Sequence, residues 1–424
     1  MPGDIAGLPY WPVTFDERGA LVAPDSRLEA DLPASGVTDL LVFSHGWNNQ
    51  ADEAEQLYRS VFGLLPGVID RVPLRAGVSL GLVGVHWPSI LFPDSAPLGT
   101  PPRTTDGTAL TDAIAPAFPG QQTTLTEIGA LLNNKPADPA DLHHFSDLLA
   151  RLVTSPATSP EDAGEQDLLS GDPLSVFGHL ATLSPTTNIT DTQALPNPFH
   201  LLWHGATEAL RAASYYEMKR RAGVVGQAGL GPLITRVAAG RPGLRVHLMG
   251  HSFGARLVAY ALTGLNNPPP SDSPIKAMLL VQGAFSHFSF AAALPFDPRR
   301  EGGLAHTQNL IDGPLLATFT AFDLAVGRLY PAASLISNTD SEGLDDLLYR
   351  WGAMGHDGYQ GVDAATVPLT AVGDTYTFTA NRFYNLDSNR IIATGPPPSG
   401  AHSDIVHPEI AYAMLAAAGI LASR

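Results

Sequence analysis

The chain has 424 residues, of which 44% are hydrophobic and 15% are charged, and this balance predicts a globular protein with a large core. Its 41 acidic and 24 basic residues leave a net charge of −17, which repels phosphate backbones and anionic headgroups. We therefore expect no nucleic-acid partner. The absence of cysteine excludes disulfides, thiolate metal sites and a cysteine nucleophile.

The first residues, MPGDIAGLPYWPVTFDERG, have no Lys or Arg before Arg18 and lack the apolar stretch of a signal peptide. The longest late apolar run, Ile410 to Ala422, is too short to cross a bilayer. We expect a cytoplasmic protein without stable membrane insertion, with export lacking a cleaved leader as the alternative. The sequence does not indicate an oligomeric state.

Apolar strand patterns alternate with helical patterns along most of the chain. The segment WPVTFDERGALVAP predicts a hairpin that turns at Gly19. Further strands are predicted at 38–44, 78–87, 244–249, 277–283, 315–321 and 376–385, and helices at 205–221, 253–265 and 408–422. This alternation predicts an α/β fold with a mostly parallel central sheet and helices on both faces.

Residues 89–200 have a different composition, with 14 prolines and with 13 acidic residues against three basic ones. Helices are nevertheless indicated by a capping-box pattern at Thr124–Glu127, by Asp172-Pro173, and by two apolar stripes. The stripes are Leu125/Ile128/Leu132 and Leu142/Phe145/Leu149/Leu152. We interpret 89–200 as a helical, Pro-rich acidic insertion acting as a lid, and 1–88 with 201–424 as the core. The alternative is an insertion with no role in binding.

The motif Gly250-His251-Ser252-Phe253-Gly254 lies where a predicted strand turns into a predicted helix. A nucleophile at such a turn adopts a strained backbone, and the residues two before and two after it crowd together. Gly250 and Gly254 occupy those two places without side chains. The pattern therefore predicts Ser252 as a nucleophile, the alternative being an ordinary turn.

A serine nucleophile needs a base and a carboxylate that orients it. His402 and His407 both follow the last predicted strand, and we favour His402 because His407 precedes a proline at a helix entrance. For the acid we favour Asp323, just beyond a strand. Its rivals in polar loops are Asp340, Asp357 and Asp387.

Acyl transfer also needs backbone donors for the oxyanion. One is expected from the N–H of Phe253, directly after the nucleophile. The segment LLVFSHGWNN follows an early strand, where Gly46 lets the backbone turn in closely beside His45 and the Trp47 N–H supplies the second donor. The alternative is a plain β-turn with a buried tryptophan.

With a strand followed by His45-Gly46-Trp47, the Gly-His-Ser-Phe-Gly motif, and Asp323 and His402 in that order, the chain resembles the α/β-hydrolase superfamily. The resemblance covers roughly residues 10–88 and 205–424 of the core, and it does not extend to 89–200. It implies a serine esterase or lipase-like hydrolase with no cofactor and a small-molecule or lipid-like ester substrate, and the acidic surface favours neutral apolar esters. The alternatives are a non-catalytic binding protein of hydrolase fold, or an amidase or acyltransferase on the same scaffold.

Other polar clusters predict no site. The histidine pairs His143-His144 and His200/His204 lack the nearby carboxylates of a metal motif, so no metal is expected. The basic run at 219–221 is expected to be a solvated helix end rather than an anion site. The glycine-rich segment 350–361 is equally compatible with a loop that lines the site and with an ordinary loop.

Overall fold

The computed structural model describes eleven segments of the chain, and they divide into two compact units. These segments are residues 3–22, 27–47, 49–89, 106–153, 161, 171–183, 198–265, 272–326, 349–350, 352–396 and 399–422. Unit 1 comprises Met1–Pro88, Arg221–Gly327 and Gly352–Arg424, and unit 2 comprises Ser89–Arg220 and Arg328–Trp351. Within the described residues, no helix combines the length and apolar character needed to cross a membrane.

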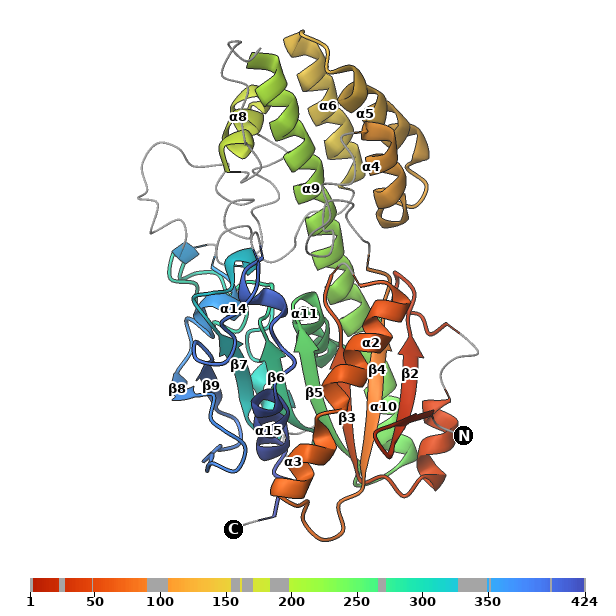
Figure 1. The fold of residues 1–424 in the computed structure, drawn as a ribbon, viewed down its shortest axis with the longest axis vertical. Helices are drawn as coiled ribbons and strands as arrows, with labels where there is room; N and C mark the ends of the chain where they lie inside the picture. The colour runs from red at the N-terminus through yellow and green to blue at the C-terminus, as the bar shows by residue number, and fades with distance from the viewer. Residues whose placement is uncertain are drawn as a thin grey trace. The chain divides into compact units, whose positions relative to one another are not determined.

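Unit 1 is built on a nine-stranded, mostly parallel sheet with the strand order β1-β2-β4-β3-β5-β6-β7-β9-β8 (Figure 1). Only the β1–β2 pair is antiparallel among the strands of this sheet. The strands are β1 (Gly3–Ile5), β2 (Leu8–Thr14), β3 (Asp39–Ser44), β4 (Leu80–His86), β5 (Arg245–His251), β6 (Ile275–Val281), β7 (Leu315–Phe319), β8 (Ala364–Pro368) and β9 (Phe383–Asp387). The α/β class and the mostly parallel sheet predicted from the sequence are confirmed.

Helices cover both faces of this sheet, which explains why its central strands are almost continuously apolar. The helices α2 (Ala51–Phe62), α3 (Leu65–Arg71) and α15 (Pro408–Ala417) pack with alternate strand residues in one buried cluster. In Figure 1 they lie in front of the sheet, and α10 (Gly231–Gly240) and α11 (Phe253–Tyr260) lie behind it. Between α9 (Pro198–Val224) and α10 the chain makes a π-helical turn, Val225–Leu230.

The described part of unit 1 also contains short helical segments. They are α1 (Leu28–Asp31), α14 (Met354–Asp357) and 3-10 turns at Leu32–Ala34, Ala261–Gly264, Thr307–Leu310 and Ala401–Ser403. The last of these turns carries His402.

The structure corrects the sequence prediction at both edges of the sheet. The hairpin at Gly19 is reduced to one antiparallel bridge, Phe15 to Leu21, because β2 pairs with β1 and β4 instead. The strand predicted at 376–385 begins only at Phe383, and the edge strand β8 was not predicted. Tyr376 and Phe378 stack at 4.6 Å and pack against the core, so their apolar alternation reflects burial and not strand pairing.

Unit 2 is helical in its described part. Its helices are α4 (Gly107–Ile114), α5 (Gln122–Asn134), α6 (Pro139–Leu152) and α8 (Pro173–Leu183), with a 3-10 turn at Ala115–Ala117, and α9 (Pro198–Val224) has most of its length here. Asp106 and Asp138 cap α4 and α6, and Asp172 accepts from Ser175 N at the start of α8, as its sequence predicts.

Both predicted apolar stripes are buried in unit 2. Phe145 contacts the rings of Phe177 and Trp203 edge-on at 5.8 and 5.7 Å, so it belongs to this unit's own core. A substitution at Phe145 therefore acts first on the stability of unit 2. The capping-box prediction is wrong, because α5 already begins at Gln122.

Two of the three basic residues at the end of α9 are buried, contrary to the expectation of a solvated helix end. Lys219 and Arg221 are each only 2% exposed. Arg221 Nη1 donates to the Pro88 carbonyl oxygen at 2.9 Å. Arg220 pairs with Glu217 one helical turn earlier. This part of the helix is therefore held by specific polar contacts within the protein.

Candidate active site

Ser252 occupies a sharp turn between the end of β5 and the start of α11. Its backbone has φ +57° and ψ −121°, a region that costs a non-glycine residue on the order of 1–3 kcal/mol. The turn is held by a hydrogen bond from Ser252 N to the Val281 carbonyl oxygen at 3.1 Å, and the Ser252 carbonyl oxygen accepts from Ala284 N at 3.2 Å. Strand β6 thus fixes the serine in a strained conformation typical of a nucleophile elbow.

The two glycines of the motif are required by close approach. A Cβ atom at Gly250 would lie 2.3 Å from the Gly254 carbonyl oxygen, and one at Gly254 would lie 2.2 Å from the Ser44 carbonyl oxygen. Both distances are far below van der Waals contact. The spacing of these glycines around Ser252 is therefore a steric requirement of the turn.

His402 lies between Ser252 and Asp323 and is within hydrogen-bonding distance of both. Its Nε2 is 2.8 Å from Ser252 Oγ, and its Nδ1 is 2.8 Å from Asp323 Oδ2. Asp323 is fully buried, so neither of its carboxylate oxygens is exposed to solvent. In this arrangement Nδ1–H donates to the carboxylate, which leaves Nε2 free to accept the serine proton.

The loops that carry His402 and Asp323 are joined directly to each other. Ala401 N donates to the Phe322 carbonyl oxygen at 2.9 Å, and Asp323 and Gly400 form an isolated β-bridge. Gly400 has φ +60°, and a Cβ atom there would lie 2.3 Å from the Phe322 carbonyl oxygen. The loops after β7 and β9 therefore place the acid and the histidine as one assembly.

The rival residues lie elsewhere. His407 Nε2 is 2.8 Å from Asp404 Oδ1, and His407 forms the N-cap of α15. Asp357 contacts two other histidines. Its Oδ1 lies 2.7 Å from His356 Nδ1, and its Oδ2 lies 3.0 Å from His287 Nδ1. Asp387 accepts from Asn389 on the surface. Asp340 lies outside the described residues.

The segment His45-Gly46-Trp47, which is expected to supply an oxyanion donor, lies in close contact with Ser252 at Gly46. A Cβ atom at Gly46 would lie 2.7 Å from Ser252 Cβ and 3.2 Å from Ser252 Oγ. The Trp47 ring lies 6.1 Å from the ring of Phe253, the first residue of α11. The backbone of Gly46, directly before Trp47, and that of Phe253, directly after Ser252, are therefore both close to the nucleophile.

His45 supports this segment as a neutral imidazole. Its Nδ1 lies 2.8 Å from the Gly46 carbonyl oxygen and its Nε2 accepts from Trp87 N at 3.4 Å, so the proton is on Nδ1. Complete burial lowers the pKa of His45 to about 3. The Trp87 ring stacks on it at 5.5 Å. His45 is therefore a structural support for Gly46 and not a second base.

His251 contacts the loop that carries His402. Its Nε2 lies 2.9 Å from the His402 carbonyl oxygen, and the two rings are 5.0 Å apart. Burial, reinforced by the nearby His402, lowers the pKa of His251 to about 3. A neutral Nε2–H therefore donates to the backbone that carries His402.

This buried histidine makes folding stability depend on pH. Unfolded histidine has a pKa of about 6.5, so between about pH 6.5 and 3 the unfolded state binds a proton that folded His251 does not. Its contribution is complete above pH 6.5 and is lost on acidification at up to about 1.4 kcal/mol per pH unit.

His251→Gln keeps a donor at this place but does not titrate. We expect its unfolding free energy, measured by urea titration, to fall about 2 kcal/mol less from pH 6 to pH 4 than that of the parent. Equal losses in the two proteins would contradict this assignment.

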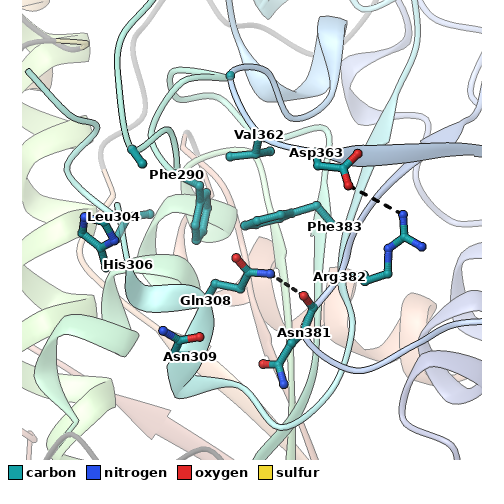
Figure 2. Close-up of a pocket in the computed structure, with 12 residues that line it drawn as sticks. Phe290, Leu304, His306, Gln308, Asn309, Val362, Asp363, Asn381, Arg382 and Phe383 are labelled. Carbon is teal, nitrogen blue, oxygen red and sulfur yellow. Dashed lines mark hydrogen bonds and ion pairs between the residues drawn. The ribbon is translucent and has the colours of Figure 1, made fainter. Parts of the chain in front are cut away.

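A separate pocket of about 350 Å³ lies at the amino end of β9 (Figure 2). It is lined at the amino end of β9 by Phe383 and Arg382, whereas Asp323 follows the carboxyl end of β7. Phe290 and Phe383 form its inner wall, and Gln308 bonds the Asn381 carbonyl oxygen at its rim. The pocket therefore lies at the amino ends of the parallel strands, whereas Asp323 follows a carboxyl end.

The described residues contain no group of three or more His, Asp or Glu side chains placed to hold a metal ion. His144 pairs with Glu127 at 2.8 Å on the surface of unit 2.

Searches of protein-family models, curated proteins and solved structures find no match. The functional argument therefore depends on the residues themselves.

One contact of the site was not predicted from the sequence. Gln282, which follows β6, donates from Nε2 to Asp323 Oδ2 at 2.8 Å, and Val326 N donates to Oδ1 at 3.2 Å. The only signal in the sequence is a polar residue at the end of the apolar run AMLLVQG. That signal does not reveal which group the amide contacts.

Proposed function

We propose that this chain is a serine hydrolase of the α/β-hydrolase type that cleaves carboxylic esters through an acyl-enzyme. The observation that carries the proposal is the position of His402, 2.8 Å from both Ser252 Oγ and Asp323 Oδ2. Two features of the fold support it, namely the strained turn at Ser252 and the mostly parallel sheet that presents it. The order Ser, Asp, His along the chain is that of the superfamily.

The chemistry proposed for these residues follows from their hydrogen bonds. Ser252 Oγ attacks the acyl carbon while His402 Nε2 takes its proton, and Asp323 stabilises the imidazolium through Nδ1–H. His402 then gives the proton to the leaving alcohol. In the second half, His402 Nε2 takes a proton from a water molecule as that water attacks the acyl carbon. The bond from this carbon to Ser252 Oγ then breaks, His402 returns the proton to Oγ, and the carboxylic acid leaves.

The negative charge that develops on the substrate oxygen needs preorganised donors. We assign this role to the backbone N–H groups of Phe253, which follows Ser252, and of Trp47, which follows the closely approaching Gly46. Phe253 begins α11, so the positive end of that helix adds to the stabilisation. The requirement for glycine at position 46 is consistent with a backbone that must approach the nucleophile closely.

Neutral, apolar esters are the proposed substrate class. The net charge of −17 disfavours anionic substrates. Phe322, directly before Asp323, is 49% exposed, and the Trp47 ring lies 6.1 Å from the ring of Phe253, the residue after the nucleophile. We also propose, as part of this function, that the helical insertion of residues 89–200 acts as a lid.

Pre-steady-state release of p-nitrophenol tests the proposed reaction. We expect neutral p-nitrophenyl acetate, butyrate and octanoate to give a rapid burst of up to one equivalent per chain, followed by slower turnover, because the acyl-enzyme accumulates. The monoanionic hemisuccinate ester is expected to react more slowly than the butyrate. A p-nitroanilide series run in parallel separates amidase from esterase activity. Release no faster than in buffer across the ester series would contradict the proposal.

A further inference from the structure

We propose that Gln282 is a positioning residue that locks the Asp323 carboxylate in the orientation required by His402. The inference rests on the proposed function and adds to it a residue that touches neither substrate nor nucleophile. It is carried by the backbone conformation of Gln282 and by the hydrogen-bond pattern around its amide.

The backbone of Gln282 is strained although its side chain is large. It has φ +46°, in the left-handed region that favours glycine or asparagine, and it directly follows the last residue of β6. The residue is fully buried. Such strain persists when the surroundings hold the residue in place, and it indicates a role for this side chain.

The hydrogen-bond partners of the Gln282 side chain fit an amide group in one orientation only. Nε2 donates to Asp323 Oδ2 at 2.8 Å and to the Gly355 carbonyl oxygen at 3.0 Å, and both of these partners are acceptors. Oε1 accepts from Thr318 Oγ1 at 2.9 Å. Rotating the amide by half a turn would place its oxygen against two acceptors, so the network itself fixes the orientation.

No other side chain of this size meets the same three partners. Glutamate would direct a carboxylate at the Asp323 carboxylate, and methionine has no N–H to donate. Thr318 completes the arrangement, because its hydroxyl also accepts from Gln282 N at 3.0 Å. All polar atoms of the side chain are therefore satisfied in a buried place, where an unpaired one costs about 1–3 kcal/mol.

This network acts on the histidine through Asp323. Oδ2 receives both His402 Nδ1–H and Gln282 Nε2–H at 2.8 Å, and Oδ1 receives Val326 N–H at 3.2 Å. Three donors from different directions prevent rotation of the carboxylate plane. Without the Gln282 donor the carboxylate can rotate and draw the imidazole away from Ser252, and a misplacement of about 1 Å can cost about 100-fold in rate.

Gly355 connects this network to the glycine-rich segment 350–361. A Cβ atom at Gly355 would lie 2.6 Å from the Gln282 carbonyl carbon, so only glycine allows the approach. Gly355 N donates to the Gly283 carbonyl oxygen at 2.9 Å, and Thr320 N donates to the Gly355 carbonyl oxygen at 3.0 Å. This loop is therefore a support for the acid.

Gln282→Met tests the proposal, because it keeps the side-chain length and removes the donor. We expect kcat on a p-nitrophenyl ester to fall roughly ten- to 100-fold with KM within about twofold, because binding is not altered. Gln308→Met is the matched control, since Gln308 also donates to a carbonyl oxygen but lies at the pocket of Figure 2. Gln282→Asn is the second variant if the first does not fold. Asparagine accepts the left-handed backbone, and its amide is one methylene too short to reach Asp323.

A second readout does not depend on turnover. The Nδ1 proton of His402 is expected as a far-downfield resonance in the proton NMR spectrum, and it should shift or broaden in the Gln282 variants while staying in place in Gln308→Met. If the parent hydrolyses no ester, the proposed function fails, and the NMR comparison still tests the positioning role. A Gln282 variant with parental kcat, or with an unchanged resonance, would overturn the inference.

Discussion

Ser252→Ala is expected to lower ester hydrolysis on the order of 10³-fold or more while leaving the protein folded. The loss is large because no acyl-enzyme forms without the hydroxyl, and only binding and oxyanion stabilisation are left. The fold should tolerate the change, because Ser252 holds the turn through its backbone N–H and carbonyl groups and not through its side chain. Steady-state kcat/KM on p-nitrophenyl butyrate, with the thermal unfolding midpoint measured beside it, checks both statements.

Ser286→Ala is the matched control for this experiment. Ser286 is also buried in unit 1, but its hydroxyl accepts from Phe288 N within its own loop. We expect this variant to stay within a few-fold of the parent in kcat/KM. Turnover by Ser252→Ala close to that of the parent would remove Ser252 from the mechanism.

His402→Ala is expected to lower kcat/KM as much as Ser252→Ala does. The two residues act together in one step, so removing either one abolishes that step. His407→Ala should stay close to the parent. His407 Nε2 binds Asp404, and Asp404 also accepts from Thr394, so only part of a local network is lost. Asp323→Asn should cost less than the loss of His402, since the acid orients the base and does not react. All three are compared by kcat/KM on one ester.

An opposite ranking would contradict the assignment of the base. If His407→Ala were the inactive variant, His402 would not be the base, despite its hydrogen bonds to Ser252 and Asp323. A double variant of Ser252 and His402 adds a further check. Its activity should be no lower than that of either single variant, because both changes remove the same step.

The proximity of Ser252, His402 and Asp323 could be predicted because the sequence signals at these residues are local. Ser252 lies between glycines at a strand-to-helix turn, and the structure places its backbone at φ +57°. His402 was separated from His407 by the proline that follows His407, and the structure has His407 at the N-cap of α15. Asp323 was favoured because it follows a strand, and β7 does end just before it at Phe319.

The parts that were not predicted depend on contacts distant in the sequence. Gln282 and Asp323 are separated by 41 residues, and nothing in the local pattern at Gln282 reveals its partner. Strand β8 is half-exposed and has few large apolar residues, so its sequence lacks a strong strand pattern. Tyr376 and Phe378 alternate as a strand would, yet they pack on the core as an irregular segment.

Covalent labelling tests the central claim most directly. The parent protein is incubated with a fluorophosphonate, and the adduct is counted by intact-protein mass spectrometry and located by peptide sequencing. We predict one phosphonyl group per chain, bound to Ser252 Oγ, with no adduct on Ser252→Ala and greatly slowed labelling of His402→Ala. Failure of the parent to react, or an adduct that persists on Ser252→Ala, would contradict the assignment of Ser252 as an activated nucleophile.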